Sequence, residues 1–379
     1  MHAPDEHKAF LMSQTTKNTQ PPTAALPLRK KLTYTVVALG LILGLPLILG
    51  EVACRVVMWV KHGVPGHSYG IYMADDEIGA VHRPHSYNSN SVMNNFGLRN
   101  TEDIPEQKAA GATRVYCSGG STTFCYNLNT DEAWPSLLQN KLRATPGHEK
   151  DEVLNAGEIC FSLGHEFALA RRLLPKLKPD VVILFTGVNE GMMGNQFAAQ
   201  SPTKLDELLA SKTWGVPPKN LDQARFWKRN SALTRLWDYY LKRHFEKQAT
   251  AEFRNQDEIA PRPNDPSMHP YVMANLDQTF PAYIDFIKSQ GAVPVVLRFG
   301  DNGSVNWYMR DGVRKWRERV VELAIARGVT VCDATSVFER RPDRVECFIS
   351  SGVHVTALGA DITAEELKKT LLALPAPAK

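Results

Sequence analysis

The sequence predicts a three-layer α/β/α domain built on a parallel sheet and preceded by one transmembrane helix. Two observations predict this fold class. After residue 113, short apolar runs rich in β-branched residues alternate with helical patterns, which is typical of parallel strands buried on both faces. Ahead of that region, residues 32–50 form an apolar run without a single charge. A helix of that length matches the thickness of a bilayer's hydrocarbon core.

The apolar run at 32–50 is interpreted as a signal anchor. No amphipathic face can be drawn through it, so a buried core helix is the weaker interpretation. The basic residues Arg29, Lys30 and Lys31 directly precede the run. Positive charge collects on the cytoplasmic side of membrane segments. We therefore expect a single-pass inner-membrane protein with a cytoplasmic N-terminus and its main domain in the periplasm or outside the cell.

A cleaved leader is the alternative interpretation of the same run. No A-x-A cleavage site follows the apolar residues, as a secretory signal peptide requires. Cys54 invites a lipoprotein interpretation, but Glu51 stands where a lipobox has leucine. Both observations favour an anchor that stays attached.

The chain is expected to have four parts. Residues 1–31 are polar and predict a disordered cytoplasmic tail. Residues 32–50 are the anchor, residues 51–112 a juxtamembrane segment, and residues 113–379 the main domain. Within that domain, residues 191–270 form an insertion that is aromatic and basic between Phe226 and Lys247. We interpret it as a helical insertion packed on the domain; a lid or a membrane-resting face is the alternative.

The main domain is expected to alternate strands and helices. The expected strands lie at 114–118, 152–156, 181–186, 293–299 and 329–333, and the expected helices at about 131–143, 163–177, 271–290, 311–327 and 357–373. In open sheets of this type, ligands bind beyond the carboxyl ends of the strands. Chemically active residues are therefore expected directly after each strand.

Composition excludes several function classes. The net charge of +4 over 379 residues gives no basic field for nucleic acid. The six cysteines lack the paired spacing of a zinc site, and neither G-x-G-x-x-G nor a P-loop occurs. No metal, nucleotide or other cofactor is expected. Cys117 and Cys332 are expected to be buried in strands, whereas pairing among Cys125, Cys160 and Cys347 is left open.

Three segments carry candidate catalytic residues. Gly119 and Gly120 precede Ser121 after the first strand, so a tight turn can expose the hydroxyl. Asn189 follows the third strand and offers an amide donor, and His354 lies in a loop ahead of the last helix. Each segment has a plain interpretation as well: a common turn, a turn-forming asparagine and a solvated histidine. Their order and spacing favour a joint function.

Together these segments resemble the SGNH (GDSL-like) hydrolase superfamily. The matching blocks are Gly119-Gly120-Ser121-Thr122, Gly187-Val188-Asn189-Glu190, and Ser351-Gly352-Val353-His354 with Thr356 and Gly359. The stretch Asn94–Arg99 is similar to a segment that precedes the domain in membrane-anchored members. The resemblance covers about residues 90–375. It implies a flavodoxin-like fold in which Ser121 is the nucleophile, His354 its base, and Asn189 with the Ser121 N–H the oxyanion donors.

Two positions depart from the family pattern. Cys160 stands where the family has the glycine whose N–H completes the oxyanion hole; Gly157 fills that role under a shifted alignment. A nucleophilic Cys160 would need a neighbour that stabilises its thiolate, and the sequence identifies none. Ser351 replaces the aspartate that orients the histidine. We therefore expect a Ser–His dyad, with Ser351 as the possible orienter of the imidazole, or an acid recruited from elsewhere.

The predicted function is a serine esterase or acylhydrolase that acts on acyl-oxygen esters outside the cytoplasmic membrane. Small-molecule or carbohydrate esters, including those of cell-envelope carbohydrate, are the expected substrates. A polysaccharide O-acyltransferase with the same Ser–His chemistry is one alternative. A non-catalytic carbohydrate-binding or assembly protein that retains the fold is another. The sequence leaves the oligomeric state open.

Overall fold

A computed structural model of the protein describes residues 27–62, 68–88, 90–187, 189–190, 231–233, 270–302, 307–349 and 352–375. The chain divides into two compact units, Met1–Ala53 and Cys54–Lys379, and each is described by itself. Most of the expected tail at 1–31 and of the expected insertion at 191–270 lies outside the described residues.

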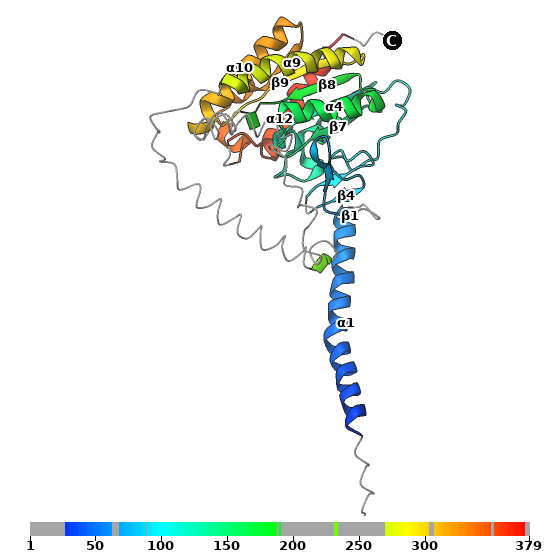
Figure 1. Ribbon diagram of the computed structural model, residues 1–379. Coiled ribbons are helices and arrows are strands. Elements are labelled where there is room, and N and C mark those ends of the chain that lie inside the picture. Colours follow the sequence, from blue (N-terminus) through cyan, green and yellow to red (C-terminus); the bar gives the residue numbers. More distant parts are fainter. Residues whose placement is uncertain are drawn as a thin grey trace, which may run out of the picture. The chain divides into compact units, whose positions relative to one another are not determined.

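The first long element is helix α1, Leu28–His62, which extends the predicted apolar run at both ends (Figure 1). Its stretch Leu28–Val57 has a mean hydropathy of 2.3 and buries none of its most apolar window inside the protein. Within the described residues it is the one helix long and apolar enough to cross a bilayer. A signal sequence near an N-terminus meets the same criterion.

The main unit is built on a five-stranded parallel sheet. The strands are β6 (Arg114–Gly119), β7 (Glu152–Gly157), β8 (Val181–Phe185), β9 (Val293–Arg298) and β10 (Thr330–Asp333). Their spatial order is β10-β9-β8-β6-β7, and every neighbouring pair is parallel. This is the flavodoxin-like order, whose switch point lies between the first and third strands of the sheet. The predicted fold class is confirmed.

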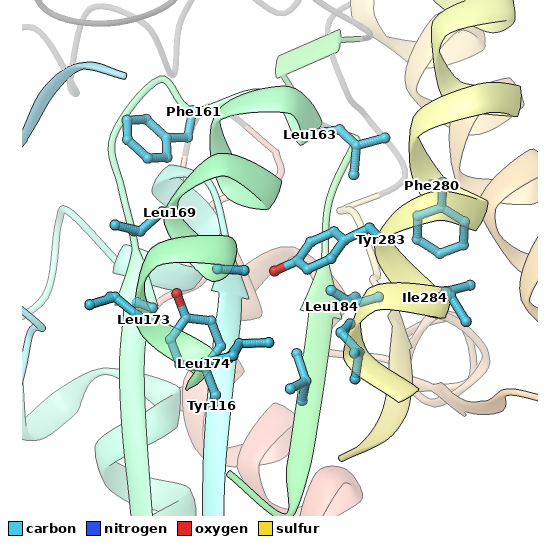
Figure 2. Close-up of a cluster of buried hydrophobic side chains, with 14 of the residues drawn as sticks. Tyr116, Phe161, Leu163, Leu169, Leu173, Leu174, Leu184, Phe280, Tyr283 and Ile284 are labelled. Carbon is cyan, nitrogen blue, oxygen red and sulfur yellow. The ribbon is translucent and has the colours of Figure 1, made fainter. Parts of the chain in front are cut away.

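Helices cover both faces of the sheet. The helices α4 (Leu163–Leu177), α9 (Pro270–Ser289) and α10 (Trp307–Ala326) share one core with one face of the sheet, and they lie together in Figure 1. The helices α3 (Trp134–Arg143), α11 (Ala334–Glu339) and α12 (Ala357–Leu372) pack on the other face. Side chains of one strand alternate between the faces: Tyr116 enters the first core (Figure 2), whereas Cys117 enters the second.

A set of short strands precedes the sheet. They are β1 (Ser68–Tyr69), β2 (Tyr72–Asp75), β3 (Gly79–His82), β4 (Ser86–Tyr87) and β5 (Val92–Met93). They form one three-stranded and one two-stranded sheet. The sequence did not predict them, because strands of two to four residues show no usable alternation.

The chain then covers the outer edge of β7, the last strand of the main sheet. The Arg99 N–H donates to the Asn155 carbonyl at 2.9 Å. The Asn100 side chain accepts from the Asn155 N–H at 3.0 Å and donates to the Val153 carbonyl at 2.8 Å. A covered edge strand has fewer free backbone groups to pair with other chains. Residues from the segment before residue 113 therefore cover one edge of the sheet that carries the candidate site.

Candidate active site

The turn after β6 presents Ser121 at the carboxyl edge of the sheet. Ser121 is the first residue of α2 (Ser121–Phe124), and extended Gly120 precedes it. The carbonyl of Gly120 accepts from the N–H groups of Thr123 and Phe124 at 3.1 and 3.0 Å. The Ser121 N–H lies in the first turn, where a helix provides no internal acceptor. The Gly-Gly-Ser segment thus forms a turn, as predicted, but Ser121 is buried in it, whereas the sequence predicted an exposed hydroxyl.

Both glycines of this turn are required by close packing. A Cβ on Gly119 would come within 2.1 Å of the Thr123 hydroxyl and 2.5 Å of the Phe185 carbonyl. A Cβ on Gly120 would come within 2.8 Å of Asn189 Nδ2. Real Cβ atoms do not approach other atoms so closely. Because residue 120 is glycine, the Asn189 side-chain amide can lie directly beside the Gly119-Gly120-Ser121 turn.

His354 is held in a compact loop before α12. The loop closes through an isolated bridge between Phe348 and Val355, and the Ile349 N–H donates to the His354 carbonyl at 2.9 Å. Thr356 caps α12, and a Cβ on Gly359 would come within 2.1 Å of the Cys347 carbonyl. The Thr and Gly that follow the histidine in the family block thus fix the base of its loop.

The loop brings His354 onto Ser121. His354 Nε2 lies 2.8 Å from Ser121 Oγ, although 233 positions separate the two residues in the sequence. The Tyr126 ring meets the imidazole edge to face, with ring centroids 4.6 Å apart. Burial lowers the pKa of His354 to about 4, because a buried imidazole disfavours its charged form. The neutral imidazole is therefore the form present near pH 7, as a general base must be.

Asn189 completes the group from the neighbouring strand. It follows β8, which pairs directly with β6, so the two residues flank the switch point of the sheet. Asn189 is buried, and its Nδ2 donates to the Phe161 carbonyl at 2.7 Å. A side-chain amide nitrogen carries two N–H groups. One of them is held by the Phe161 carbonyl.

The third candidate donor is the backbone N–H of Cys160. In the part of the chain that the structure describes, this N–H has no acceptor. The N–H of Gly157, the alternative donor, is already bonded to Asn155 Oδ1 at 3.0 Å. Of the two candidate N–H groups, that of Gly157 is therefore already occupied. Desolvation by surrounding protein atoms raises the pKa of the Cys160 thiol, although the residue is exposed, and a raised pKa disfavours a nucleophilic thiolate.

Arg99, at the end of the Asn94–Arg99 segment, contacts the carboxyl end of α2, the helix that begins at Ser121. Its fully buried guanidinium donates to the Phe124 carbonyl, to the Cys125 carbonyl at 2.8 Å and to the Leu128 carbonyl at 2.6 Å. Burial lowers its pKa to about 10, which still leaves it charged at neutral pH. The sequence identified the segment but not this contact, because a charged residue gives no sequence signal of burial.

Other predicted features have separate outcomes. Ser351, the expected orienter of His354, lies outside the described residues. Cys117 and Cys332 are buried in β6 and β10 as predicted. All six cysteines are free thiols in this structure. In the described ranges, no cluster of three His, Cys, Asp or Glu side chains is arranged to hold a metal ion.

Comparison with known families identifies the domain. Residues 117–362 match the model of the GDSL-like lipase/acylhydrolase family. This match spans more than half of the chain and includes the segments that carry Ser121, Asn189 and His354. The chain belongs to the GDSL-like lipase/acylhydrolase family. It is thus an SGNH-type acylhydrolase or esterase.

Solved structures similar to this GDSL-family enzyme share little of its sequence. A lipase/acylhydrolase from Enterococcus faecalis is 15% identical with a TM-score of 0.42, and the match covers 70% of this chain and 99% of that one. An acetylxylan esterase from Geobacillus stearothermophilus is 12% identical with a TM-score of 0.42, covering 70% and 96%. A lipolytic protein of the G-D-S-L family from Desulfitobacterium hafniense is 15% identical with a TM-score of 0.39, covering 68% and 99%. No curated protein matches the chain in sequence.

Proposed function

We propose that this enzyme is a serine esterase that cleaves acyl-oxygen esters with Ser121 as nucleophile and His354 as general base. The observation that supports this most strongly is the 2.8 Å contact between Ser121 Oγ and His354 Nε2. Nucleophile and base must lie within hydrogen-bond reach of each other for covalent catalysis. Burial lowers the pKa of His354 to about 4, so the neutral imidazole that can accept the serine proton is the form present near pH 7.

The proposed reaction has two steps. Ser121 Oγ attacks the ester carbonyl carbon while His354 Nε2 takes the hydroxyl proton, and the carbonyl oxygen becomes an oxyanion. His354 then returns the proton to the departing alcohol, which leaves an acyl group on Ser121. A water molecule gives its proton to His354 and attacks the acyl carbon; the acid departs, and the proton returns to Ser121.

The proposed oxyanion hole consists of the Ser121 and Cys160 N–H groups and the Asn189 side-chain amide. The first two N–H groups have no acceptor among the described residues, and Asn189 Nδ2 lies beside the Gly120 backbone. Donors fixed in advance stabilise developing charge without reorganisation during the reaction. Removal of one such donor typically costs about a hundredfold or more in rate.

The proposed location is the outer side of the cytoplasmic membrane. We assign residues 1–31 to a cytoplasmic tail, 32–50 to a membrane anchor, 51–112 to a juxtamembrane segment, and 113–379 to the catalytic domain with its insertion at 191–270. The length and hydropathy of α1 support an anchor, and the basic residues 29–31 support this orientation. Esters of cell-envelope carbohydrate are the proposed natural substrates, because they lie on that side.

One assay tests the catalytic proposal. Purified full-length protein in detergent should release the alcohol of a short-chain aryl ester, and Ser121→Ala should lose this activity by about a thousandfold or more. Ser289→Ala removes an exposed hydroxyl at the end of α9 and should match wild type. Equal turnover by Ser121→Ala and wild type would refute the assignment. A second assay separates transfer from hydrolysis. The enzyme is given an acetylated oligosaccharide as acyl donor or a free oligosaccharide as acyl acceptor, and the acylated sugar formed by transfer is compared with the free acid formed by hydrolysis.

Two measurements test the location. A reporter fused to the C-terminus should be active only if it is exported, so activity in the cytoplasm would overturn the orientation. The intact mass of membrane-extracted protein should include residues 28–62, whereas a mass that lacks them would show that α1 is a cleaved leader.

A further inference from the structure

Two adjacent residues after β8 hold the loop that carries Cys160. Asn189 Nδ2 donates to the Phe161 carbonyl at 2.7 Å. Its neighbour Glu190 accepts, through Oε1, the N–H of Leu163 at the start of α4. Both side chains are about 95% buried, so neither contact competes with bulk water. Figure 2 shows Phe161 and Leu163 at the amino end of α4.

The loop that leads into these contacts needs such support. Cys160 has a φ of +66°, a left-handed conformation that side-chain-bearing residues rarely adopt. Cys160 itself is exposed and lies between the end of β7 and the start of α4. Its backbone conformation therefore depends on contacts made by the residues on either side.

Glu158 fixes the N-terminal end of the loop, directly after β7. Its N–H donates to the Gly119 carbonyl at 3.0 Å, and its carboxylate accepts the His82 N–H at 3.1 Å. His82 Nε2 lies 2.9 Å from the second carboxylate oxygen of Glu158. The loop is thus tied to the sheet at Glu158 and to the end of β8 at Phe161 and Leu163. Cys160 lies between the two attachments.

A second buried carboxyl group, that of Glu166, interacts electrostatically with Glu190. Glu166 is buried on α4, and burial together with the charge of Glu190 raises the pKa of Glu166 well above its ordinary value. Two neighbouring carboxylates in a dry interior do not both ionise. Burial raises the pKa of Glu190 as well, to about 7, so Glu166 is the group with the more strongly raised pKa. Oε1 of Glu190 accepts the Leu163 N–H, and a carboxyl group keeps an acceptor oxygen whether or not it is ionised.

We propose that Glu190 is a positioning residue of the oxyanion hole: through the Leu163 N–H it fixes the Cys160–Leu163 loop and so aims the Cys160 N–H at the reacting oxygen. This inference rests on the proposed function, because it assigns Cys160 to the oxyanion hole. Glu190 itself does not touch the substrate. Its contribution comes from the acceptor atom and not from its charge.

Three substitutions of Glu190 separate the effect of its acceptor oxygen from the effect of its negative charge. Glu190→Gln keeps an oxygen at the same reach and removes the charge. Glu190→Asp keeps the charge but withdraws the oxygen by one methylene group, and Glu190→Leu removes the acceptor. Full-length proteins in detergent are compared by kcat and KM on an aryl ester. Hydrogen exchange of the amides in 159–165 is compared in parallel, with residues 276–287 of α9 as the internal control.

The Asp and Leu variants should lose about ten- to a hundredfold in kcat, as for a misplaced oxyanion donor, with KM changed less than about threefold. Their 159–165 amides should exchange faster, while the Gln variant matches wild type in both measurements. A Leu variant that keeps wild-type kcat and protection would overturn the proposal, as would a Gln variant as impaired as Leu.

Two further outcomes are also decisive. If Glu190→Leu does not fold, the comparison of Asp with Gln decides whether the acceptor atom positions the loop. If wild type hydrolyses no ester, the proposed function fails by itself. The exchange rates then test the contact between Glu190 and Leu163 separately: equal protection in wild-type, Gln and Asp proteins contradicts its role, and loss in Asp alone supports the structural half of the inference.

Discussion

The guanidinium of Arg99 lies 4.4 Å from the centroid of the Phe124 ring and donates to the carbonyl of the same residue. Phe124 is the last residue of the helix that begins with Ser121. A residue from the segment ahead of the sheet is thus bonded to the last residue of α2, the helix that begins with Ser121. This contact joins the edge-covering segment to the candidate active site.

Replacing Arg99 should destabilise the protein strongly. Arg99→Met would leave the carbonyls of Phe124, Cys125 and Leu128 buried without their donor. We expect a loss of about 3 kcal/mol or more in the free energy of unfolding, since buried groups then lack partners. Chemical denaturation followed by tryptophan fluorescence measures it. Arg319→Met removes only exposed ion pairs, with Asp277 and Glu322, and should change stability far less.

Gly120→Ala should impair catalysis without unfolding the protein. The added methyl would meet Asn189 Nδ2 at 2.8 Å and the Phe161 carbonyl at 3.3 Å, so the amide must move away from the nucleophile turn. We expect kcat to fall about a hundredfold, with KM changed little. Gly164→Ala is the matched control, because its Cβ would meet no atom within 4 Å. Equal kcat values for the two variants would argue against Asn189 as an oxyanion donor.

Cys160→Gly should remain active. The substitution keeps the backbone N–H and suits the left-handed φ of +66°, so kcat should stay within about threefold of wild type if the backbone supplies the donor. Steady-state hydrolysis of an aryl ester measures it. Ser121→Ala is the inactive reference in the same assay. Loss of activity in Cys160→Gly on the scale of Ser121→Ala would mean that the sulfur takes part in the chemistry.

As the pH is lowered, kcat/KM should fall with a midpoint well below the pKa of an ordinary histidine. Only neutral His354 can accept the serine proton, so kcat/KM falls as pH drops through its pKa. Burial lowers that pKa to about 4, against about 6.5 for an unperturbed imidazole. Activity should therefore hold from about pH 8 to pH 5 and halve near pH 4. Fluorescence at each pH verifies folding, and a midpoint at or above 6.5 is the opposing result.

The sequence predicted the parts of the fold that have a strong local signal. Apolar runs such as Val181–Phe185 indicated the sheet, because a strand buried on both faces has few polar residues. The Gly119-Gly120-Ser121 turn was recognisable because close packing at this turn requires glycine. The contact of Ser121 with His354 came only from the resemblance, since nothing local encodes a pairing across 233 positions.

Other features had no usable sequence signal. Glu166 and Glu190 are typical surface carboxyls by composition, yet both are buried beside the candidate site. Arg99 is a similar case: its burial depends on backbone carbonyls that any sequence can offer. The strands β2 and β3 are four residues each, too short for periodicity to separate them from loop. Tertiary contacts decide all three cases.

The most direct test of the central claim is covalent labelling with a fluorophosphonate, a reagent that modifies activated serine hydroxyls. Full-length wild type is treated, digested and analysed by mass spectrometry. We predict a single adduct on the peptide that contains Ser121, absent in Ser121→Ala and formed at least about a hundredfold more slowly in His354→Gln. Folded wild-type protein that stays unlabelled, or an adduct on another residue, would contradict Ser121 as the nucleophile.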